Sequence, residues 1–176
     1  MNLEDIIAKS MNQSAVDVFS TMLGVELAAG AVTVESGTPE ANDGVMSFIG
    51  LAGAWSGSGS LTCSPALACR ICAQMLMMEV ASVNEDVLDA VAELTNMIIG
   101  SVKNDLEAHL GPLGLSIPTV VFGRNFKTKS ARTSEWIVLR FPWDHEVLVV
   151  KLCLAPSEKT AHAVTHMLGQ TCPLEV

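Results

Sequence analysis

The order of elements along the chain occurs twice, and this repeat most constrains the fold. Apolar residues at helical spacing predict a long helix over 3–23 that ends at Gly24, a common helix terminator. The runs AVTVES, GVMSFIGLAG and SGSLTC follow as predicted antiparallel strands. Ser64 and Pro65 then suit the N-cap and first turn of a shorter helix, PALACRICAQMLMMEV.

The second half of the chain repeats this order. Ser82 and Glu85 have the spacing of a capping box, which predicts a second long helix reaching about His109. Predicted strands SIPTVVFG, EWIVLRFP and EVLVVKLCLA precede a last short helix, SEKTAHAVTHML. Locally, SAVDVFSTM matches DAVAELTNM and LTCSP matches LCLAP. We therefore expect an α+β fold with two pseudo-equivalent halves, about 1–80 and 81–176, in which two long helices and some shorter ones pack on an antiparallel β-sheet.

Composition limits the domain count and the partners. A chain of 176 residues with 49% hydrophobic and 16% charged residues suits one compact domain over 1–176. The net charge of -9 would repel a phosphate backbone, which argues against nucleic acid. No apolar stretch reaches the roughly 20 residues that cross a bilayer, and Glu4 and Asp5 stand where a signal peptide has basic residues. We expect a cytoplasmic protein without membrane association.

A polar stripe interrupts the apolar run ELTNMIIG in the second long helix. Asp89, Glu93, Asn96 and Gly100 follow one another at three- or four-residue spacing and so share one face. A plain solvated stripe is one interpretation. However, Asn is a weaker helix former than Glu, Lys or Gln, and its carboxamide can orient a water molecule. The opposite side is predicted to face the core, with Val87, Val91, Leu94, Ile98 and Val102.

The pair of Glu93 and Asn96 lacks reactive groups of its own. The sequence places no nucleophile, base or metal beside it, so a device that positions water would find the remaining machinery in its substrate. In the first long helix the matching positions hold Val18 and Thr21, so only one helix carries the pair.

Other motifs indicate a site less strongly. Cys69 and Cys72 form a single CxxC, and the odd total of five cysteines argues against a disulfide framework. His162 and His166 have the spacing of zinc proteases but lack the adjacent Glu. The run WSGSGSL does not match a Walker A loop and is interpreted as a hairpin connection. The segment GRNFKTKSARTSEW is predicted to be a basic loop, either solvated or in contact with an acidic partner, with Arg124, Lys127, Lys129 and Arg132.

These residues resemble a known signature. The arrangement Asp89-x3-Glu93-x2-Asn96 on a long helix, followed by Pro118, is similar to that of the CheC/CheX/FliY phosphatases, which act on the phosphorylated chemotaxis response regulator CheY. The pseudo-repeated order of helices and strands fits this family as well. The chain looks most like the CheX type, because CheC-type members carry the Glu/Asn pair on both long helices and FliY-type members have an additional domain.

The resemblance implies a mechanism. Asn96 would hold a water molecule in line with the aspartyl phosphate of a CheY-type receiver domain, and Glu93 would pair with the receiver's Lys. The receiver would supply Mg²⁺, so we expect no cofactor in this chain. The alternative is a non-catalytic module of the same fold that binds a receiver or a motor component. A metal-dependent enzyme using the histidines or cysteines is a third and more remote possibility.

The resemblance also implies partner contacts. Asp89 and Gly100 would contact the receiver beside the pair. The charge of the basic loop, and not the resemblance, makes Arg124 and Lys127 further candidates for contact with an acidic surface of the partner. A homodimer formed through a sheet edge is expected.

Overall fold

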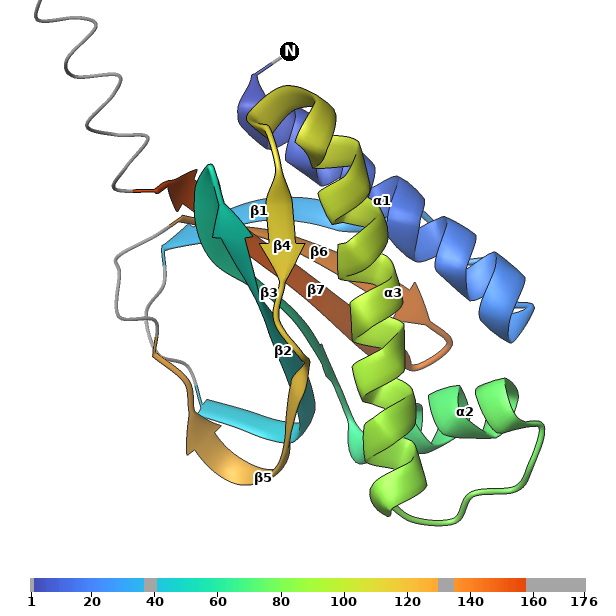
Figure 1. Ribbon diagram of the computed structural model, residues 1–176. Helices are drawn as coiled ribbons and strands as arrows, with labels where there is room; N and C mark the ends of the chain where they lie inside the picture. Colours follow the sequence, from blue (N-terminus) through green and yellow to red (C-terminus); the bar gives the residue numbers. More distant parts are fainter. Residues whose placement is uncertain (1, 37–40, 130–134, 158–176) are drawn as a thin grey trace, which may run out of the picture.

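The structure is a computed structural model, and it describes residues 2–36, 41–129 and 135–157. Over these ranges one antiparallel sheet carries helices on a single face, so the predicted α+β class is confirmed (Figure 1). In chain order the elements are α1 (Leu3–Val18), the π-helical turn η1 (Phe19–Leu23), β1 (Ala31–Ser36), β2 (Ala41–Gly53), β3 (Trp55–Cys63), α2 (Pro65–Leu76), α3 (Glu85–Leu110), β4 (Leu113–Leu115), β5 (Thr119–Lys127), β6 (Glu135–Trp143) and β7 (Glu146–Pro156).

The strand order confirms the two pseudo-equivalent halves. The described sheet runs β1-β6-β7-β3-β2-β4, and β5 also pairs with β2. We match β1, β2 and β3 of the first half with β5, β6 and β7 of the second half. From one edge the strand order is then β1-β6-β7-β3-β2-β5, and from the other edge the matching strands follow in the same order. Strands β3 and β7 lie next to each other at the centre. The edge strands are exchanged, because β1 pairs with β6 of the second half and β5 with β2 of the first. The two halves therefore interlock in one sheet.

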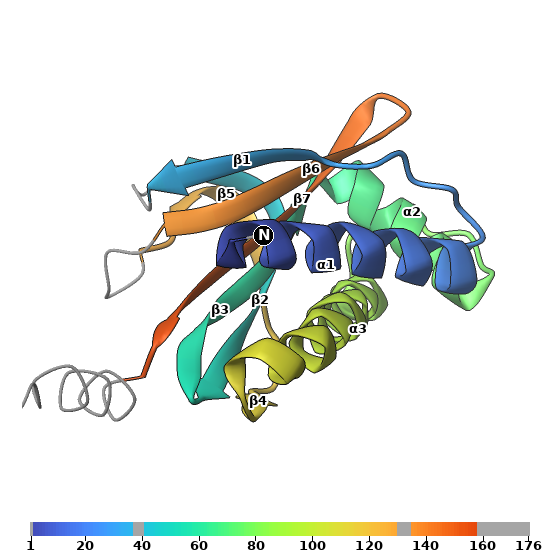
Figure 2. The same cartoon turned by 90° about the horizontal axis from the view of Figure 1, so that it is seen from above.

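The two long helices, α1 and α3, lie on the same side of the sheet (Figure 2). As predicted, the first ends at Gly24, whose φ of 63° is left-handed, and Ser64 caps α2 by accepting a hydrogen bond from the Leu67 N–H. The predicted capping box at Ser82 is wrong. Helix α3 begins after Asn84, whose side chain accepts from the Val87 N–H, and Asn and Ser are equally good N-caps.

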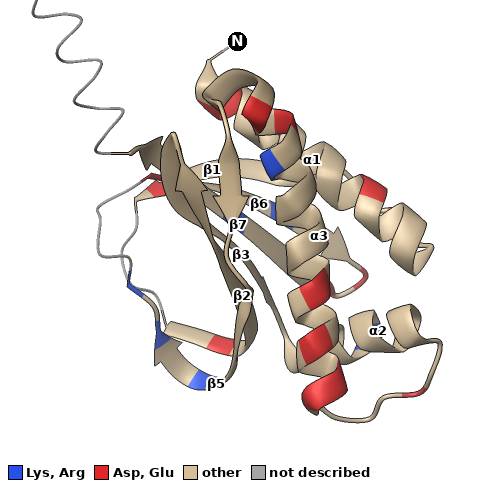
Figure 3. Cartoon of the chain, in the orientation of Figure 1, with Lys and Arg blue, Asp and Glu red and all other residues tan. Residues whose placement is uncertain are grey.

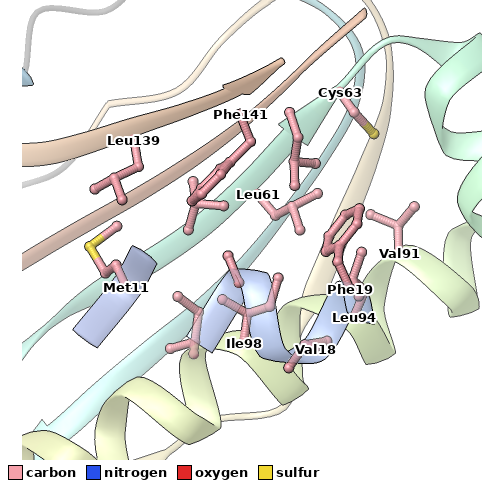
Figure 4. Close-up of a cluster of buried hydrophobic side chains, with 14 of the residues drawn as sticks. Met11, Val18, Phe19, Leu61, Cys63, Val91, Leu94, Ile98, Leu139 and Phe141 are labelled. Carbon is pink, nitrogen blue, oxygen red and sulfur yellow. The ribbon is translucent and has the colours of Figure 1, made fainter. Parts of the chain in front are cut away.

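Between helices and sheet lies a core of apolar side chains, including Phe19 from the π-helical turn, Leu94 from α3 and Phe141 from β6 (Figure 4). Glycine permits part of this packing. A Cβ placed on Gly59 of β3 would lie 2.7 Å from Cδ1 of Ile99, so α3 approaches β3 more closely than any side chain there would allow. This close approach fixes α3 against the centre of the sheet.

Two loop predictions are wrong. The run WSGSGSL lies inside strand β3. The pairing of β2 with β3 ends at Leu51 and Gly57, so only Trp55 and Ser56 of the run fall in the hairpin connection. A Cβ on Gly57 would lie 1.9 Å from the carbonyl oxygen of Cys153, so close strand packing requires these small residues. Strand β5 continues to Lys127, which places Arg124 and Lys127 on a strand rather than in a loop. The predicted last helix, from its second residue on, and both of its histidines lie outside the described residues.

Candidate functional site

Helix α3 is the scaffold of the candidate site. All five of its predicted core residues are fully buried, namely Val87, Val91, Leu94, Ile98 and Val102. On the other side Asp89 and Glu93 are exposed, whereas Asn96 and Gly100 are partly exposed. The predicted division of the helix into a core side and a polar side is therefore confirmed, and the polar stripe projects from a helix that is anchored along its length.

The backbone under the stripe is held by its neighbours. Thr95, fully buried beside Asn96, donates a hydrogen bond from Oγ1 to the Val91 carbonyl oxygen at 2.7 Å. Residues three apart on a helix are neighbours on its surface, with Cβ atoms about 5–6 Å apart, so Glu93 and Asn96 can act on one small group. Neither forms a side-chain hydrogen bond or ion pair within the part of the chain that the structure describes. Both side chains are available to a partner.

The stripe lies in an acidic field. The first half of α3 carries Glu85, Asp86, Asp89 and Glu93 and no Lys or Arg. Figure 3 shows this half of the helix as successive red bands without blue among them. Among the described residues no cation pairs with these carboxylates, whereas Glu107 near the end of the helix is paired with Lys103 at 2.9 Å. This face suits a cationic group brought by a partner.

The first half of the molecule uses the matching positions for other purposes. Val18 ends α1 with 8% of its surface exposed and belongs to the core. Thr21 lies in the π-helical turn and donates its hydroxyl to the carbonyl oxygen of Asp17 at 2.7 Å. A buried valine and a threonine bonded to its own helix leave no second carboxylate–carboxamide face.

The other candidate residues are spread around α3. Gly100 faces the segment after α3, since a Cβ added to it would lie 3.8 Å from Cδ1 of Leu115. Pro118 connects β4 to β5 in that same segment. Arg124 and Lys127 are both exposed near the end of β5, a different element from the helix that carries the stripe. The structure thus brings Glu93, Asn96, Asp89 and Gly100 together on one face but not the two basic residues.

The sequence did not single out the loop between β4 and β5 as part of this surface. Its residue Ile117 is 87% exposed, and Phe122 on β5 is 50% exposed. The signal that could have identified Ile117 is its place directly before Pro118, since a proline restricts the preceding residue to an extended conformation.

The described residues offer no metal site. They contain no group of three or more His, Cys, Asp or Glu side chains placed to hold a metal ion. Burial raises the pKa of the Cys63 thiol to about 12 and also raises the pKa values of Cys69 and Cys72, which keeps these thiols protonated. Within the described ranges, no helix combines the length and apolar character needed to span a bilayer.

Comparisons with known proteins identify a family and a shared fold. The family model of the chemotaxis phosphatase CheX matches residues 45–142, which include the whole stripe. The CheY-P phosphatase CheX of Thermotoga maritima is 32% identical over 126 residues, 70% of this chain and 80% of that protein.

Solved structures show the same architecture. The chemotaxis protein CheX from Desulfovibrio desulfuricans has a TM-score of 0.76 and 28% identity, covering 85% of this chain and 99% of that one. The CheX–CheY–BeF3–Mg²⁺ complex from Borrelia burgdorferi contains a chain with the same fold, with a TM-score of 0.65 and 24% identity, covering 83% of this chain and 96% of that one.

Proposed function

The chain belongs to the CheX family of chemotaxis phosphatases, and from this premise we propose that it hydrolyses the aspartyl phosphate of a CheY-type receiver domain. The observation that carries the proposal is the pair of Glu93, which is exposed, and Asn96, which is partly exposed, on an anchored helix without partners among the described residues. A relative that is named a CheY-P phosphatase and a relative bound to CheY support the choice of substrate.

Asn96 acts on the attacking water. Its carboxamide oxygen accepts one hydrogen bond from the water, so that the water oxygen points at phosphorus opposite the bond that breaks. The water oxygen forms a new P–O bond, the bond to the receiver's aspartate breaks, and the aspartate leaves as a carboxylate while the water's protons remain with phosphate and solvent. Orientation of this kind raises the rate by about a hundredfold or more without a covalent intermediate in this chain.

Glu93 binds the receiver and sets the position of Asn96. Its carboxylate has no ion pair among the described residues and lies in an acidic field; it pairs with the receiver's Lys, which fixes α3 over the phosphorylation site. The receiver also supplies the Mg²⁺ that neutralises charge on the phosphoryl group, and this chain needs no cofactor of its own. Asp89 adds to the field at one end of the stripe.

Gly100 permits close approach at the other end of the stripe. Glycine within a helix costs about 1 kcal/mol relative to alanine, and nothing around Gly100 in the folded chain requires it, since an added Cβ would make an ordinary contact at 3.8 Å. Because Gly100 has no side chain, the backbone of the receiver can come close to the helix at this position.

The basic residues of β5 form a more distant contact in this proposal. Arg124 and Lys127 are exposed, and they would meet acidic residues outside the receiver's active site. Replacing both by Glu should slow turnover at low salt more than at high salt. An equal rate at both salt concentrations would contradict this contact.

We also infer a cytoplasmic homodimer. Strand β1 ends the described sheet and exposes Val32 and Val34 at about half of their surface, 51% and 50%. An edge strand with apolar side chains is a natural place for a second copy to add to the sheet. Sedimentation at micromolar concentration tests this, and a monomer would contradict it.

The decisive experiment compares phosphate loss from phosphorylated receivers of the same genome with wild type, Asn96→Ala and Glu93→Ala. We expect wild type to accelerate hydrolysis, Asn96→Ala to lose about a hundredfold in kcat, and Glu93→Ala to lose mainly affinity. Asn104→Ala, exposed on the same helix, and Glu79→Ala, exposed on the segment before it, are matched controls and should keep wild-type rates.

The alternative of a non-catalytic binding module makes a different prediction. Wild type would then bind the phosphorylated receiver without shortening its lifetime, and Asn96→Ala would behave like wild type. Full activity in Asn96→Ala would leave a phosphatase but would contradict the role of Asn96.

A further inference from the structure

Beside the stripe on α3 stands an exposed apolar side chain that the folded chain does not use. Ile117 is 87% exposed, although burying an isoleucine is favourable by about 1.5–3 kcal/mol and core positions are where such residues usually lie. It belongs to the connection between β4 and β5, which runs back alongside α3 in the opposite direction (Figure 1).

The geometry of the chain places Ile117 about level with Asn96 along the helix axis. Gly100 of α3 lies next to Leu115, since its added Cβ would be 3.8 Å from Cδ1 of that residue. Asn96 lies four residues before Gly100, which is a distance of about 6 Å along the helix axis. Ile117 lies two residues after Leu115, which is a distance of about 6.6 Å along an extended chain. Because this chain runs opposite to α3, both distances are measured in the same direction. Any partner that covers Asn96 therefore comes close to Ile117.

The connection holds Ile117 in place. The backbone N–H of Ser116 donates to the Gly50 carbonyl oxygen at 2.9 Å, and the Ser116 hydroxyl oxygen accepts from the Gly50 N–H at 2.9 Å. The same hydroxyl donates to the Ile117 carbonyl oxygen at 3.0 Å, and Pro118 restricts Ile117 to an extended conformation. A side chain presented by a backbone this constrained loses little conformational freedom on binding.

The connection that carries Ile117 holds one residue more than the part of β2 opposite it. Leu51 of β2 pairs with Leu115, and Phe48 of β2 pairs with Thr119. The two β2 residues are three positions apart, whereas their partners are four positions apart. The extra residue falls between Leu115 and Thr119. An extra residue opposite a strand changes the direction of the side chains around it, and such irregularities are frequent beside functional sites.

We propose that Ile117 is a docking residue for the phosphorylated receiver, and that it contacts an apolar patch flanking the phosphorylation site. The contact holds the receiver beside α3 and so places Asn96 over the phosphoryl group. This inference rests on the proposed function, and it assigns to Ile117 a role in binding and none in the chemical step.

The test measures KM and kcat for dephosphorylation, together with the Kd for a receiver loaded with beryllofluoride, a stable mimic of its acyl phosphate. Ile117→Ser should raise KM and Kd by about tenfold and leave kcat within about twofold. Ile117→Leu, which keeps the apolar volume, should restore both constants to within about threefold of wild type. Melting temperatures should be unchanged, because the side chain contributes little to the folded core.

Val147→Ser is the matched control. Val147 is also β-branched and 45% exposed, but it lies on β7 rather than beside α3. It should leave KM and Kd as they are. An unchanged KM and Kd in Ile117→Ser, a loss confined to kcat, or an equal loss in Val147→Ser would overturn the inference.

These outcomes separate the inference from the proposed function. If wild type hydrolyses the receiver phosphate and Ile117→Ser does so with the same KM, only the role of Ile117 fails. If wild type binds the beryllofluoride receiver without catalysing hydrolysis, the proposed function fails and the Kd values alone decide on Ile117. Absence of both hydrolysis and binding for every receiver tested overturns both.

Discussion

Val18 and Glu93 occupy matching positions of the internal repeat, but their surroundings differ. Val18 packs in the core with 8% of its surface exposed, beside the π-helical turn that ends the first long helix. Glu93 lies on the outer side of a helix that continues without interruption for several more turns. The change in helix geometry, and not only the change of residue, removes the second site.

Introducing the carboxylate into the first helix should therefore destabilise the protein. Val18→Glu would bury a charge without a partner, and we expect a loss of about 2–4 kcal/mol in the free energy of unfolding. Thr21→Asn, at an exposed position, should change it by less than about 1 kcal/mol. Urea denaturation measures both changes. A Val18→Glu variant as stable as wild type, with increased phosphatase activity, would show that the first helix retains a latent site.

At the scale of elements, periodicity predicted the helices and most of the strands, and packing decided what it could not. Strand β1 begins and ends where the run AVTVES predicts it. The small residues of WSGSGSL have low strand propensity and look like a turn, but β3 is central and its neighbours leave no room for larger side chains. Backbone proximity of this kind is invisible in a single sequence.

The candidate site was predictable to the same extent. The face of α3 follows from the 3.6-residue period, which is a local property. The proximity of Ile117 to Asn96 cannot be predicted from local sequence, because it depends on how the chain returns beside α3 after β4. The cap of α3 illustrates a smaller ambiguity, since Ser82 and Asn84 are both suitable residues and only the hydrogen bond to the Val87 N–H distinguishes them.

Gly100 provides a test at this scale. Gly100→Ala should stabilise α3, by about 0.5–1 kcal/mol in the free energy of unfolding, because the added methyl group meets only an ordinary contact with Leu115. If the receiver approaches the helix backbone there, the same variant should bind it several-fold more weakly. Denaturation and receiver titration together give both values. A gain in stability with unchanged affinity would show that Gly100 is not a contact residue.

At the scale of the whole molecule, ionic contacts join the two interlocked halves. Glu35 of β1 forms ion pairs with Arg140 of β6 and with Lys151 of β7, so one carboxylate of the first half bridges two strands of the second. The hydrogen bond from Arg140 lowers the pKa of Glu35, burial opposes this effect, and the charge of Lys151 adds to it. Protonation of Glu35 would remove the charge that pairs β1 with the second half.

The sign of the resulting pH dependence follows from the lowered pKa. Because Glu35 binds a proton less readily in the folded state, its contribution to stability is present above its unfolded pKa of about 4.3 and is lost as pH falls through the folded value. Glu35→Gln should cost about 0.5–1 kcal/mol at pH 7, a modest value for partly exposed pairs, and less at pH 3. Glu79→Gln, at an exposed position without an ion pair among the described residues, should cost little at either pH. Denaturation of wild type, Glu35→Gln and Glu79→Gln at pH 7 and pH 3 measures the loss in the free energy of unfolding. If the loss in Glu35→Gln is as large at pH 3 as at pH 7, the ion pairs do not hold β1 in the sheet.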